Sequence, residues 1–209
     1  MLDDSKFRSI LCLNGELPER EFFLRNLPIV AADGAFLKLQ KMNVKPHITI
    51  GDFDSVCKED LLDYDHLHLP DQSSSDFQKC LSYMTEENLL PAIIVGVHGG
   101  FIDHIMQNIN IFLKTDSAFY APPVYGFTIK NKETQRITVK KGQKISLLGM
   151  PSAIVDTEGL KWDLQRSELT FPGRSACFNR ANQDFIDITV HEGCLLVLHY
   201  LEAIEDAGW

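Results

Sequence analysis

Two aspartates, Asp52 and Asp54, follow an apolar segment and a glycine in residues 48–55, ITIGDFDS. In extended backbone, side chains two positions apart point to the same side, so the two carboxylates would lie together. Ionising both is costly because they repel each other, and a hard cation such as Mg²⁺ relieves that repulsion. Because Mg²⁺ is commonly held by one or two carboxylates together with substrate phosphates, the spacing indicates a metal–phosphate site. The alternative is that both residues only cap a turn and the next helix.

A second polar stretch, residues 71–76 (DQSSSD), lies directly before an expected helix. A helix N-terminus offers backbone N–H groups to an anion, the serines add hydroxyls, and Asp76 adds a possible metal ligand. An ordinary capped helix start, with Ser75 or a neighbour as the N-cap, explains the same residues.

A third stretch begins with Gly99-Gly100 and continues into a helix expected over residues 102–113. A glycine pair after a strand is compatible with a phosphate loop, although it is a weak signal alone. Asp103 and Gln107 share one face of this helix, as do His104 and Asn108, because they are four residues apart. These residues would either contact a nucleotide or face solvent.

The elements that must position these residues alternate along the first part of the chain. Five strands are expected, at residues 8–13, 28–32, 48–50, 66–69 and 91–97, and helices are expected near 18–27, after Gly34, and at 58–62, 73–83 and 102–113. This alternation predicts a mainly parallel sheet with helices on both faces and ligands at the carboxyl ends of the strands. Asp33, Asp52 and Asp103 each follow an expected strand, which favours a shared site.

From about residue 115 the pattern changes to strands alone. They are expected at residues 124–129, 135–139, 144–148, 153–155, 185–190 and 194–200, with turns at Lys141-Gly142, Gly173 and Glu192-Gly193. We therefore expect an α/β fold class with two domains: an α/β domain over residues 1–135, which carries the candidate metal and phosphate ligands, and an all-β sandwich over 136–209.

Two residues of the β region are candidates for ligand binding. Trp162, in the sequence GLKW at 159–162, belongs either to the core or to an aromatic face that stacks on a flat cation. Asn179 lies in an apolar stretch, so its amide requires a hydrogen-bond partner, either from the protein or from a ligand.

The composition excludes several classes of protein. A net charge of −9 and a pI near 5.2 argue against nucleic acid or an anionic membrane as the main partner. The apolar runs are too short to span a bilayer, and the N-terminus shows no signal peptide, which predicts a cytoplasmic protein. The five cysteines are scattered and odd in number, which predicts free thiols rather than disulfides or a zinc site.

Taken together, these stretches resemble the thiamine pyrophosphokinase family. The resemblance runs in order through ADG at 32–34, GDFDS at 51–55, DQ at 71–72 with Asp76, GG at 99–100 with Asp103, His104 and Asn108, ISLL at 145–148, and GLKW at 159–162. It implies an α/β domain followed by a β-sandwich, and a homodimer with active sites between subunits. It also implies transfer of a pyrophosphoryl group from MgATP to the hydroxyl of thiamine, giving thiamine pyrophosphate and AMP.

The resemblance further implies a role for each matching residue. The metal ligands would be Asp52, Asp54 and Asp76, and the catalytic carboxylates would be Asp54, Asp76 and Asp103. The nucleotide, ATP, would contact Asp33, Gly34, Gly99, Gly100, His104 and Asn108. Thiamine would contact Gln72, Trp162 and Asn179.

The chain departs from the family pattern at several positions, including Phe101 in place of an arginine, Ser73 in place of a carboxylate, and Phe178 in place of a serine. The loss of the arginine removes a bidentate phosphate clamp. It therefore keeps open a non-catalytic sensor that binds thiamine or nucleotide. The Asp-x-Asp spacing keeps open a Mg²⁺-dependent phosphohydrolase with an aspartyl nucleophile.

Overall fold

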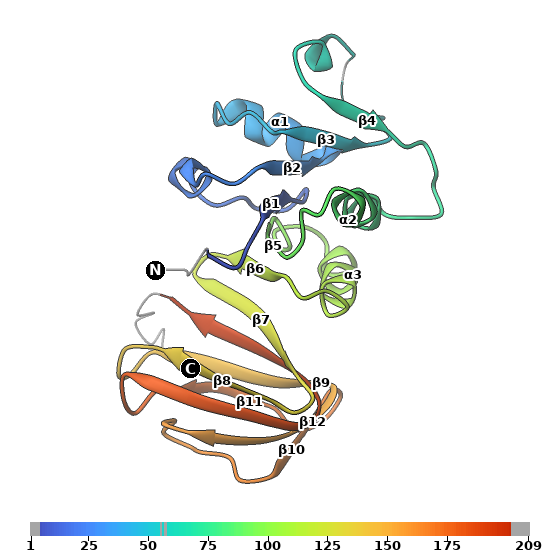
Figure 1. The fold of residues 1–209 in the computed structure, drawn as a ribbon. Coiled ribbons are helices and arrows are strands. Elements are labelled where there is room, and N and C mark those ends of the chain that lie inside the picture. Colours follow the sequence, from blue (N-terminus) through green and yellow to red (C-terminus); the bar gives the residue numbers. More distant parts are fainter. Residues whose placement is uncertain (1–4, 55, 57, 202–209) are drawn as a thin grey trace. The chain divides into compact units, whose positions relative to one another are not determined.

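The computed structural model describes residues 5–54, 56 and 58–201. The chain forms two compact units, residues 1–121 and 122–209, each of which is described by itself (Figure 1). Strand β7 (Val124–Lys130) and the start of β8 (Glu133–Thr138) lie in the second unit, whereas the expected boundary after residue 135 assigns them to the first.

The first unit is built on a parallel sheet whose strand order is β6-β5-β1-β2-β3-β4. Its strands are β1 (Ser9–Cys12), β2 (Ile29–Ala32), β3 (Ile48–Gly51), β4 (His66–His68), β5 (Ala92–Val95) and β6 (Ala118–Ala121). Every residue of β1, β2 and β5 is buried, as expected for central strands covered on both faces. The predicted α/β architecture is confirmed.

In the described part of the first unit, three α-helices and two short 3₁₀-helices connect these strands. The α-helices are α1 (Asp33–Lys41), α2 (Asp76–Glu86) and α3 (Ile102–Phe112), and the 3₁₀-helices are Arg20–Leu24 and Lys58–Leu61. The prediction of a full helix over residues 18–27 is wrong, because the first 3₁₀-helix spans only five residues and ends where Arg25 is extended. No helix in the described part of the chain is long and apolar enough to cross a membrane.

The strand order creates a switch point between β1 and β5. From β1 the chain proceeds through β2, β3 and β4 to one edge of the sheet, and then returns to place β5 and β6 on the other side. The loops that leave β1 and β5 therefore diverge and open a crevice at the carboxyl ends of the strands.

The second unit consists of antiparallel strands organised by two long ones, β9 (Lys144–Glu158) and β12 (Phe185–Tyr200). Strand β12 pairs with β7, β8 and β9, whereas β9 also pairs with β10 (Ser167–Thr170) and β11 (Ala176–Arg180). The predicted β-rich C-terminal region is confirmed.

The turn predicted at Glu192-Gly193 is wrong, because β12 continues through these residues with a register shift against β9. Gly193 has a φ of +84°, and a Cβ there would lie 2.1 Å from the carbonyl oxygen of Ser152. A glycine inside a strand can mark a bulge as well as a turn. Sequence alone did not distinguish the two.

Four cysteines are free thiols, namely Cys12, Cys80, Cys177 and Cys194. The expectation of free thiols is confirmed for these four. Cys57, like Ser55 of the GDFDS stretch, lies outside the described residues.

His199 of β12 should make stability fall on mild acidification. It is 7% exposed, its Nε2 has no hydrogen-bond partner in the structure, and burial lowers its pKa below the ordinary value of 6.5. As the pH falls through 6.5, the unfolded chain takes up a proton that the folded chain resists, so the free energy of unfolding decreases. Denaturant unfolding at pH 7.5 and pH 5.5 should show a smaller decrease for His199→Phe than for His47→Phe, a control at an exposed histidine. Equal decreases would contradict this role.

Candidate functional site

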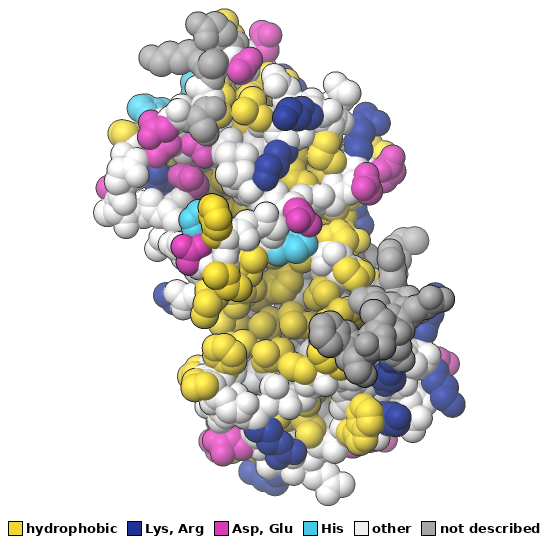
Figure 2. Space-filling model, turned by 180° about the vertical axis from the view of Figure 1, so that it is seen from behind, with side chains coloured by type: hydrophobic (Ala, Val, Ile, Leu, Met, Phe, Trp, Pro, Cys, Tyr) yellow, Lys and Arg dark blue, Asp and Glu magenta, His cyan; other side chains and the backbone are white. Residues whose placement is uncertain are grey.

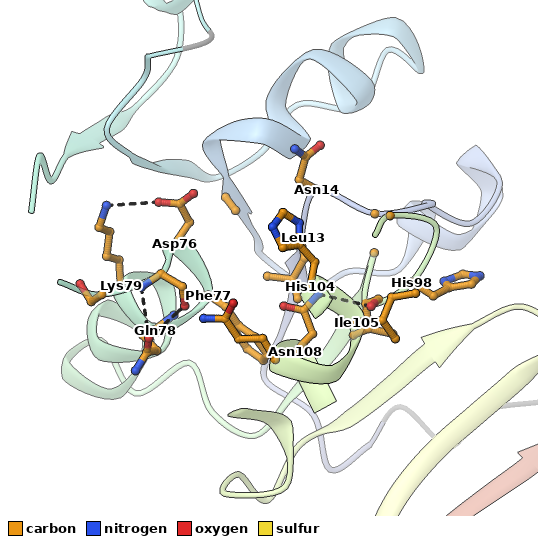
Figure 3. A pocket seen from close by; sticks show the side chains of 18 of the residues that line it. Leu13, Asn14, Asp76, Phe77, Gln78, Lys79, His98, His104, Ile105 and Asn108 are labelled. Carbon is orange, nitrogen blue, oxygen red and sulfur yellow. Dashed lines mark hydrogen bonds and ion pairs between the residues drawn. The ribbon is translucent and has the colours of Figure 1, made fainter. Parts of the chain in front are cut away.

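A cleft of about 470 Å³ lies at the carboxyl end of the parallel sheet (Figure 3). It is lined by residues that end or follow β1, β2, β3 and β5, and by the first turns of α2 and α3. Figure 3 shows Asp76 and Lys79 on one side of the cleft and Asn14 and His104 on the other. The cleft coincides with the switch point, where α/β sheets of this kind bind ligands.

Asp33 lies behind one wall of the cleft and holds the loop that forms this wall. It is buried at the start of α1, where its carboxylate accepts hydrogen bonds from the N–H groups of Gly34 and of Phe53, the latter at 2.9 Å. Burial is the main cause that raises the pKa of Asp33, and the nearby carboxylates of Asp76 and Asp52 raise it further. Asp33 therefore orders the loop after β3, where Phe53 adopts a positive φ of 58°, and it does not itself line the cleft.

Gly51 makes this arrangement possible. A Cβ at Gly51 would lie 2.4 Å from the Cγ of Asp33, so any side chain there would displace the carboxylate. The glycine of the GDFDS stretch is thus needed for the approach of Asp33, as well as for ending the strand.

Asp52 enters the cleft, whereas Asp54 is exposed and does not line it. The Oδ2 of Asp52 accepts a hydrogen bond from Nε2 of Gln72 at 2.7 Å, and its Oδ1 accepts one from the N–H of Asp54 at 3.3 Å. The bond from Gln72 is the main cause that lowers the pKa of Asp52. Asp52 therefore caps a turn, as the alternative interpretation proposed, and is also an ionised group in the cleft.

The DQSSSD stretch satisfies many of its own polar groups. Asp71 accepts hydrogen bonds from the N–H and hydroxyl of Ser73 and from the hydroxyl of Ser74, and the hydroxyl of Ser73 is the main cause that lowers the pKa of Asp71. Ser75 is the N-cap of α2 and forms a capping box with Gln78. The capped-helix interpretation is confirmed, and it leaves Asp76 at the first helical position beside the cleft.

Lys79 is a site residue that the sequence did not reveal. Its side chain is 4% exposed, and its Nζ lies 3.3 Å from Oδ1 of Asp76. A lysine inside an amphipathic helix is normally expected to face solvent, and the i, i+3 spacing from Asp76 was the only available signal.

The carboxylates do not form a complete metal site by themselves. Among the described residues, no group of three or more His, Cys, Asp or Glu side chains is arranged to hold a metal ion. Asp52 and Asp76 nevertheless both line the cleft, and Mg²⁺ usually takes only one or two protein carboxylates, completing its shell with phosphate oxygens and water. The donor set therefore fits a Mg²⁺ ion that arrives with a phosphate ligand.

The loop before α3 and the first two turns of α3 supply part of the opposite wall. Gly100, His104 and Asn108 line the cleft, and Nδ2 of Asn108 donates a hydrogen bond to the carbonyl of Val97 at 3.3 Å. Asp103 is exposed and accepts a hydrogen bond from the N–H of His104.

Besides Asp33 and Asp54, three further expected site residues of the first unit, Asp103, Gly34 and Gly99, do not line the cleft. Gly99 has a φ of +90°, and a Cβ there would lie 2.3 Å from Cγ of Glu16. Gly34 lies against the side chain of Asn14, because a Cβ at Gly34 would be 2.4 Å from its Nδ2. Both glycines therefore allow close packing behind the cleft wall.

The loop after β1 contributes residues that the sequence did not identify as site candidates. Asn14 and Gly15 line the cleft together with His98 from the loop after β5. A Cβ at Gly15 would lie 2.0 Å from the carbonyl oxygen of His98, and Nζ of Lys38 donates hydrogen bonds to the carbonyls of Asn14 and Gly15. The strand order that places β1 beside β5 could have identified these loops.

Trp162 and Asn179 lie in the second unit, where the structure joins them directly. The side chain of Trp162 is 57% exposed, which excludes the core interpretation, whereas Asn179 is 3% exposed. Nδ2 of Asn179 donates a hydrogen bond to the carbonyl of Trp162 at 2.8 Å, and Oδ1 accepts bonds from the N–H groups of Trp162 and Arg180. Asn179 thus holds the backbone that presents the indole ring.

Replacing Asn179 by Ala should loosen that backbone. Loss of these bonds leaves partly buried polar groups of the main chain without their present partner, which should lower the free energy of unfolding by about 1 kcal/mol. If Trp162 contacts a ligand, affinity for that ligand should fall by about tenfold, the equivalent of roughly 1.4 kcal/mol. Denaturant unfolding and a ligand titration would measure the two effects. Wild-type stability in this variant would contradict the positioning role.

Two family models match most of the chain. The family model described as thiamin pyrophosphokinase, catalytic domain, matches residues 22–121, and the model described as thiamin pyrophosphokinase, vitamin B1 binding domain, matches residues 127–195. Thiamine pyrophosphokinase 1 of Oryza sativa is 27% identical over 173 residues, which cover 71% of this chain and 64% of the relative. Thiamine pyrophosphokinase 2 of Arabidopsis thaliana is 28% identical over 167 residues, covering 69% and 61%. The chain thus matches less than two thirds of the length of these plant relatives.

Solved structures share the fold. Yeast thiamin pyrophosphokinase superposes with a TM-score of 0.79 at 19% identity, covering 94% of this chain and 87% of the yeast chain. Thiamine pyrophosphokinase from Bacillus subtilis gives a TM-score of 0.78 at 16% identity, covering 92% and 98%. Because the two family models together match well over half of its residues, the chain belongs to the thiamin pyrophosphokinase family.

Proposed function

We propose that the protein transfers a pyrophosphoryl group from MgATP to the hydroxyl of thiamine, producing thiamine pyrophosphate and AMP. One observation carries the proposal above the others. The carboxylates of Asp52, after β3, and Asp76, at the start of α2, both line the switch-point cleft of a chain that matches both a catalytic and a vitamin B1 binding family model. The reaction depends mainly on positioning and on neutralising phosphate charge, and a cleft of this kind can supply both.

The metal-facing group in this proposal consists of Asp52, Asp54 and Asp76. Asp52 and Asp76 line the cleft, and Asp54 is exposed two residues from Asp52, where its carboxylate is available to a phosphate-bound ion. Mg²⁺, when bound, would neutralise phosphate charge and polarise the phosphorus under attack. Asp33 supports the loop that carries Asp52, and Asp103 orders the first turn of α3.

The nucleotide side is formed by the loops after β1 and β5 and by α3. We assign Gly100, His104 and Asn108 to contacts with ATP, with Gly34 and Gly99 allowing the close packing of the walls. Phe101, which replaces the family arginine, is 79% exposed and does not line the cleft. It therefore removes a cation from the site without filling the space that a nucleotide would occupy.

Thiamine is assigned to Gln72, Trp162 and Asn179. Gln72 lines the cleft and already donates a hydrogen bond to Asp52, which places an amide beside the proposed metal. The exposed indole of Trp162 is suited to stacking on the thiazolium cation, since tryptophan is the strongest aromatic partner for a cation. Asn179 contributes by holding the backbone of Trp162.

We propose that the working form is a homodimer. Exposed hydrophobic side chains gather at the start of α3, where Phe101, Ile102 and Met106 are 79%, 72% and 59% exposed. Figure 2 shows that hydrophobic side chains, coloured yellow, also reach the surface elsewhere in each unit. Large exposed apolar surfaces commonly mark interfaces. Sedimentation analysis of the wild type and of Met106→Glu would test this, and a monomeric wild type would refute it.

The proposed reaction is tested by incubating the protein with thiamine, Mg²⁺ and ATP and separating the products by chromatography. Equal amounts of AMP and thiamine pyrophosphate would support it. ADP together with thiamine monophosphate would refute the pyrophosphoryl transfer. Free phosphate without loss of thiamine would favour the phosphohydrolase, and thiamine binding without any turnover would favour the sensor.

A further inference from the structure

Lys79 has an unusual place for a lysine. It lies on α2, its side chain is 4% exposed, and its Nζ is 3.3 Å from Oδ1 of Asp76. Among the residues described as lining the cleft, Lys79 is the single lysine or arginine. Every other positive charge in the cleft must come from a ligand or from a protonated histidine.

The charges that face Lys79 are carboxylates. Its ammonium lies 3.3 Å from Oδ1 of Asp76, and, after the hydrogen bonds from Gln72 and Ser73, it also contributes to lowering the pKa of Asp52 and of Asp71. Asp76 and Asp52 in turn both lie close enough to Asp33 to disfavour its ionisation. Lys79 therefore offsets part of a crowded negative charge in the absence of any bound cation.

We propose that Lys79 is a built-in counter-cation that weakens binding of free divalent metal to Asp52 and Asp76, so that the metal enters together with the nucleotide. This inference rests on the proposed function, because it concerns the same cleft. Lys79 is a positioning residue here, since it acts through the carboxylates.

Two physical effects support the proposal. A buried ammonium and a divalent cation held by the same carboxylates repel each other across a few ångströms, so the lysine opposes metal binding. When a nucleotide is bound, its phosphates lie between the two positive charges and attract both the lysine and the metal. The lysine then no longer opposes metal binding. A purely structural ion pair would stabilise α2 without linking the metal to the nucleotide.

The experiment measures binding of Mn²⁺, used as a probe for Mg²⁺, by electron paramagnetic resonance. It compares the wild type with Lys79→Met, which keeps the length of the side chain and removes its charge. Lys41→Met, at an exposed lysine of α1, controls for a general change in net charge. Each protein is titrated without nucleotide and with α,β-methylene-ATP, an analogue that resists cleavage at the bond broken in the proposed reaction.

Without nucleotide, Lys79→Met should bind Mn²⁺ about fivefold more tightly than the wild type. The affinity of Lys41→Met for Mn²⁺ should be within about twofold of the wild type. These differences correspond roughly to the Coulomb energies between charges near a protein surface, at short and at longer distance. The analogue should tighten Mn²⁺ binding more in the wild type than in Lys79→Met. Unchanged or weaker Mn²⁺ binding by Lys79→Met without nucleotide would overturn the proposal.

Lys79→Met leaves the carboxylate of Asp76 without its ion-pair partner, which could disturb the fold. A second variant, without that unpaired charge, therefore serves as a check. Asp76→Asn combined with Lys79→Met removes both charges and should bind Mn²⁺ more weakly than Lys79→Met alone. Equal binding by the single and the double variant would show that Asp76 is not a ligand and would also overturn the proposal. The chromatographic assay of turnover tests the proposed reaction separately, so the two can fail independently.

Discussion

Asp54→Asn should reduce turnover by about 10³-fold while leaving the free energy of unfolding unchanged. The carboxylate of Asp54 is exposed, and the hydrogen bond that ties this residue to Asp52 comes from its backbone N–H. Folding therefore does not depend on the charge. Removing a ligand of a catalytic metal should cost several kcal/mol of transition-state stabilisation. A loss of about 4 kcal/mol corresponds to a decrease in rate of about 10³-fold.

The measurement is the rate of AMP and thiamine pyrophosphate formation at saturating Mg²⁺, together with a denaturant unfolding curve. Asp63→Asn is a matched control, because Asp63 is also an exposed aspartate of the first unit and lies away from the cleft. A turnover rate within a few-fold of the wild type in Asp54→Asn would remove Asp54 from the proposed metal site.

The contrast with Asp76 explains why Asp54 is the sharper test. Asp76 is paired with the buried ammonium of Lys79, so its replacement leaves a buried charge without a partner and should destabilise the fold as well. A loss of activity in an Asp76 variant would mix two causes. Asp54 separates the chemical role from the structural one.

The position of the site could be predicted from the sequence, because it follows from the parallel sheet alone. Carboxylates that follow β2 and β3 meet at the carboxyl edge, and the alternation of strands and helices predicted both strands. Which of these side chains reach the cleft and which are buried behind its wall could not be predicted. Asp33 is buried behind the cleft wall because Gly51 leaves room for it, and that fit depends on the spacing between two strands.

Lys79 and the loop after β1 illustrate the same limit. The burial of Lys79 results from how α2 packs on the sheet, which a helical pattern does not specify. Asn14 and Gly15 reach the cleft because β5 pairs with β1 rather than with β4, and strand order is not encoded locally.

In the second unit, the sequence pattern predicted most of the strands, but it divided each of the two long strands into two segments. The segments predicted at 144–148 and 153–155 are parts of β9, and those at 185–190 and 194–200 are parts of β12. Strands β6, β10 and β11 were missed. Strands β6 and β10 have four residues each and β11 has five, too few for a clear alternation, and β11 contains a register shift against β9. The short strands β10 and β11 acquire their conformation from the long strand β9, with which both pair.

Trp162→Ala should raise the KM for thiamine by about 30-fold while changing kcat by less than about threefold. A desolvated contact between a cation and an indole is worth about 2 kcal/mol, which corresponds to that change in affinity. Because the side chain is 57% exposed, its removal should cost little stability. Initial rates at varied thiamine and saturating MgATP would measure the effect.

Phe171→Ala is the matched control for Trp162→Ala, since Phe171 is a similarly exposed aromatic residue of the second unit at 53%. The substitution should leave the KM for thiamine unchanged, because Phe171 lies in the turn after β10, whereas Trp162 is held by Asn179 of β11. Trp162→Phe should recover part of the affinity, because phenylalanine retains a weaker cation-binding face.

If Trp162→Ala and Phe171→Ala raise the KM for thiamine equally, the general loss of an exposed aromatic side chain explains the effect, and the assignment of thiamine to Trp162 fails. If only Trp162→Ala does so, the second unit contributes directly to substrate recognition, and Asn179 acts through the ring that it positions.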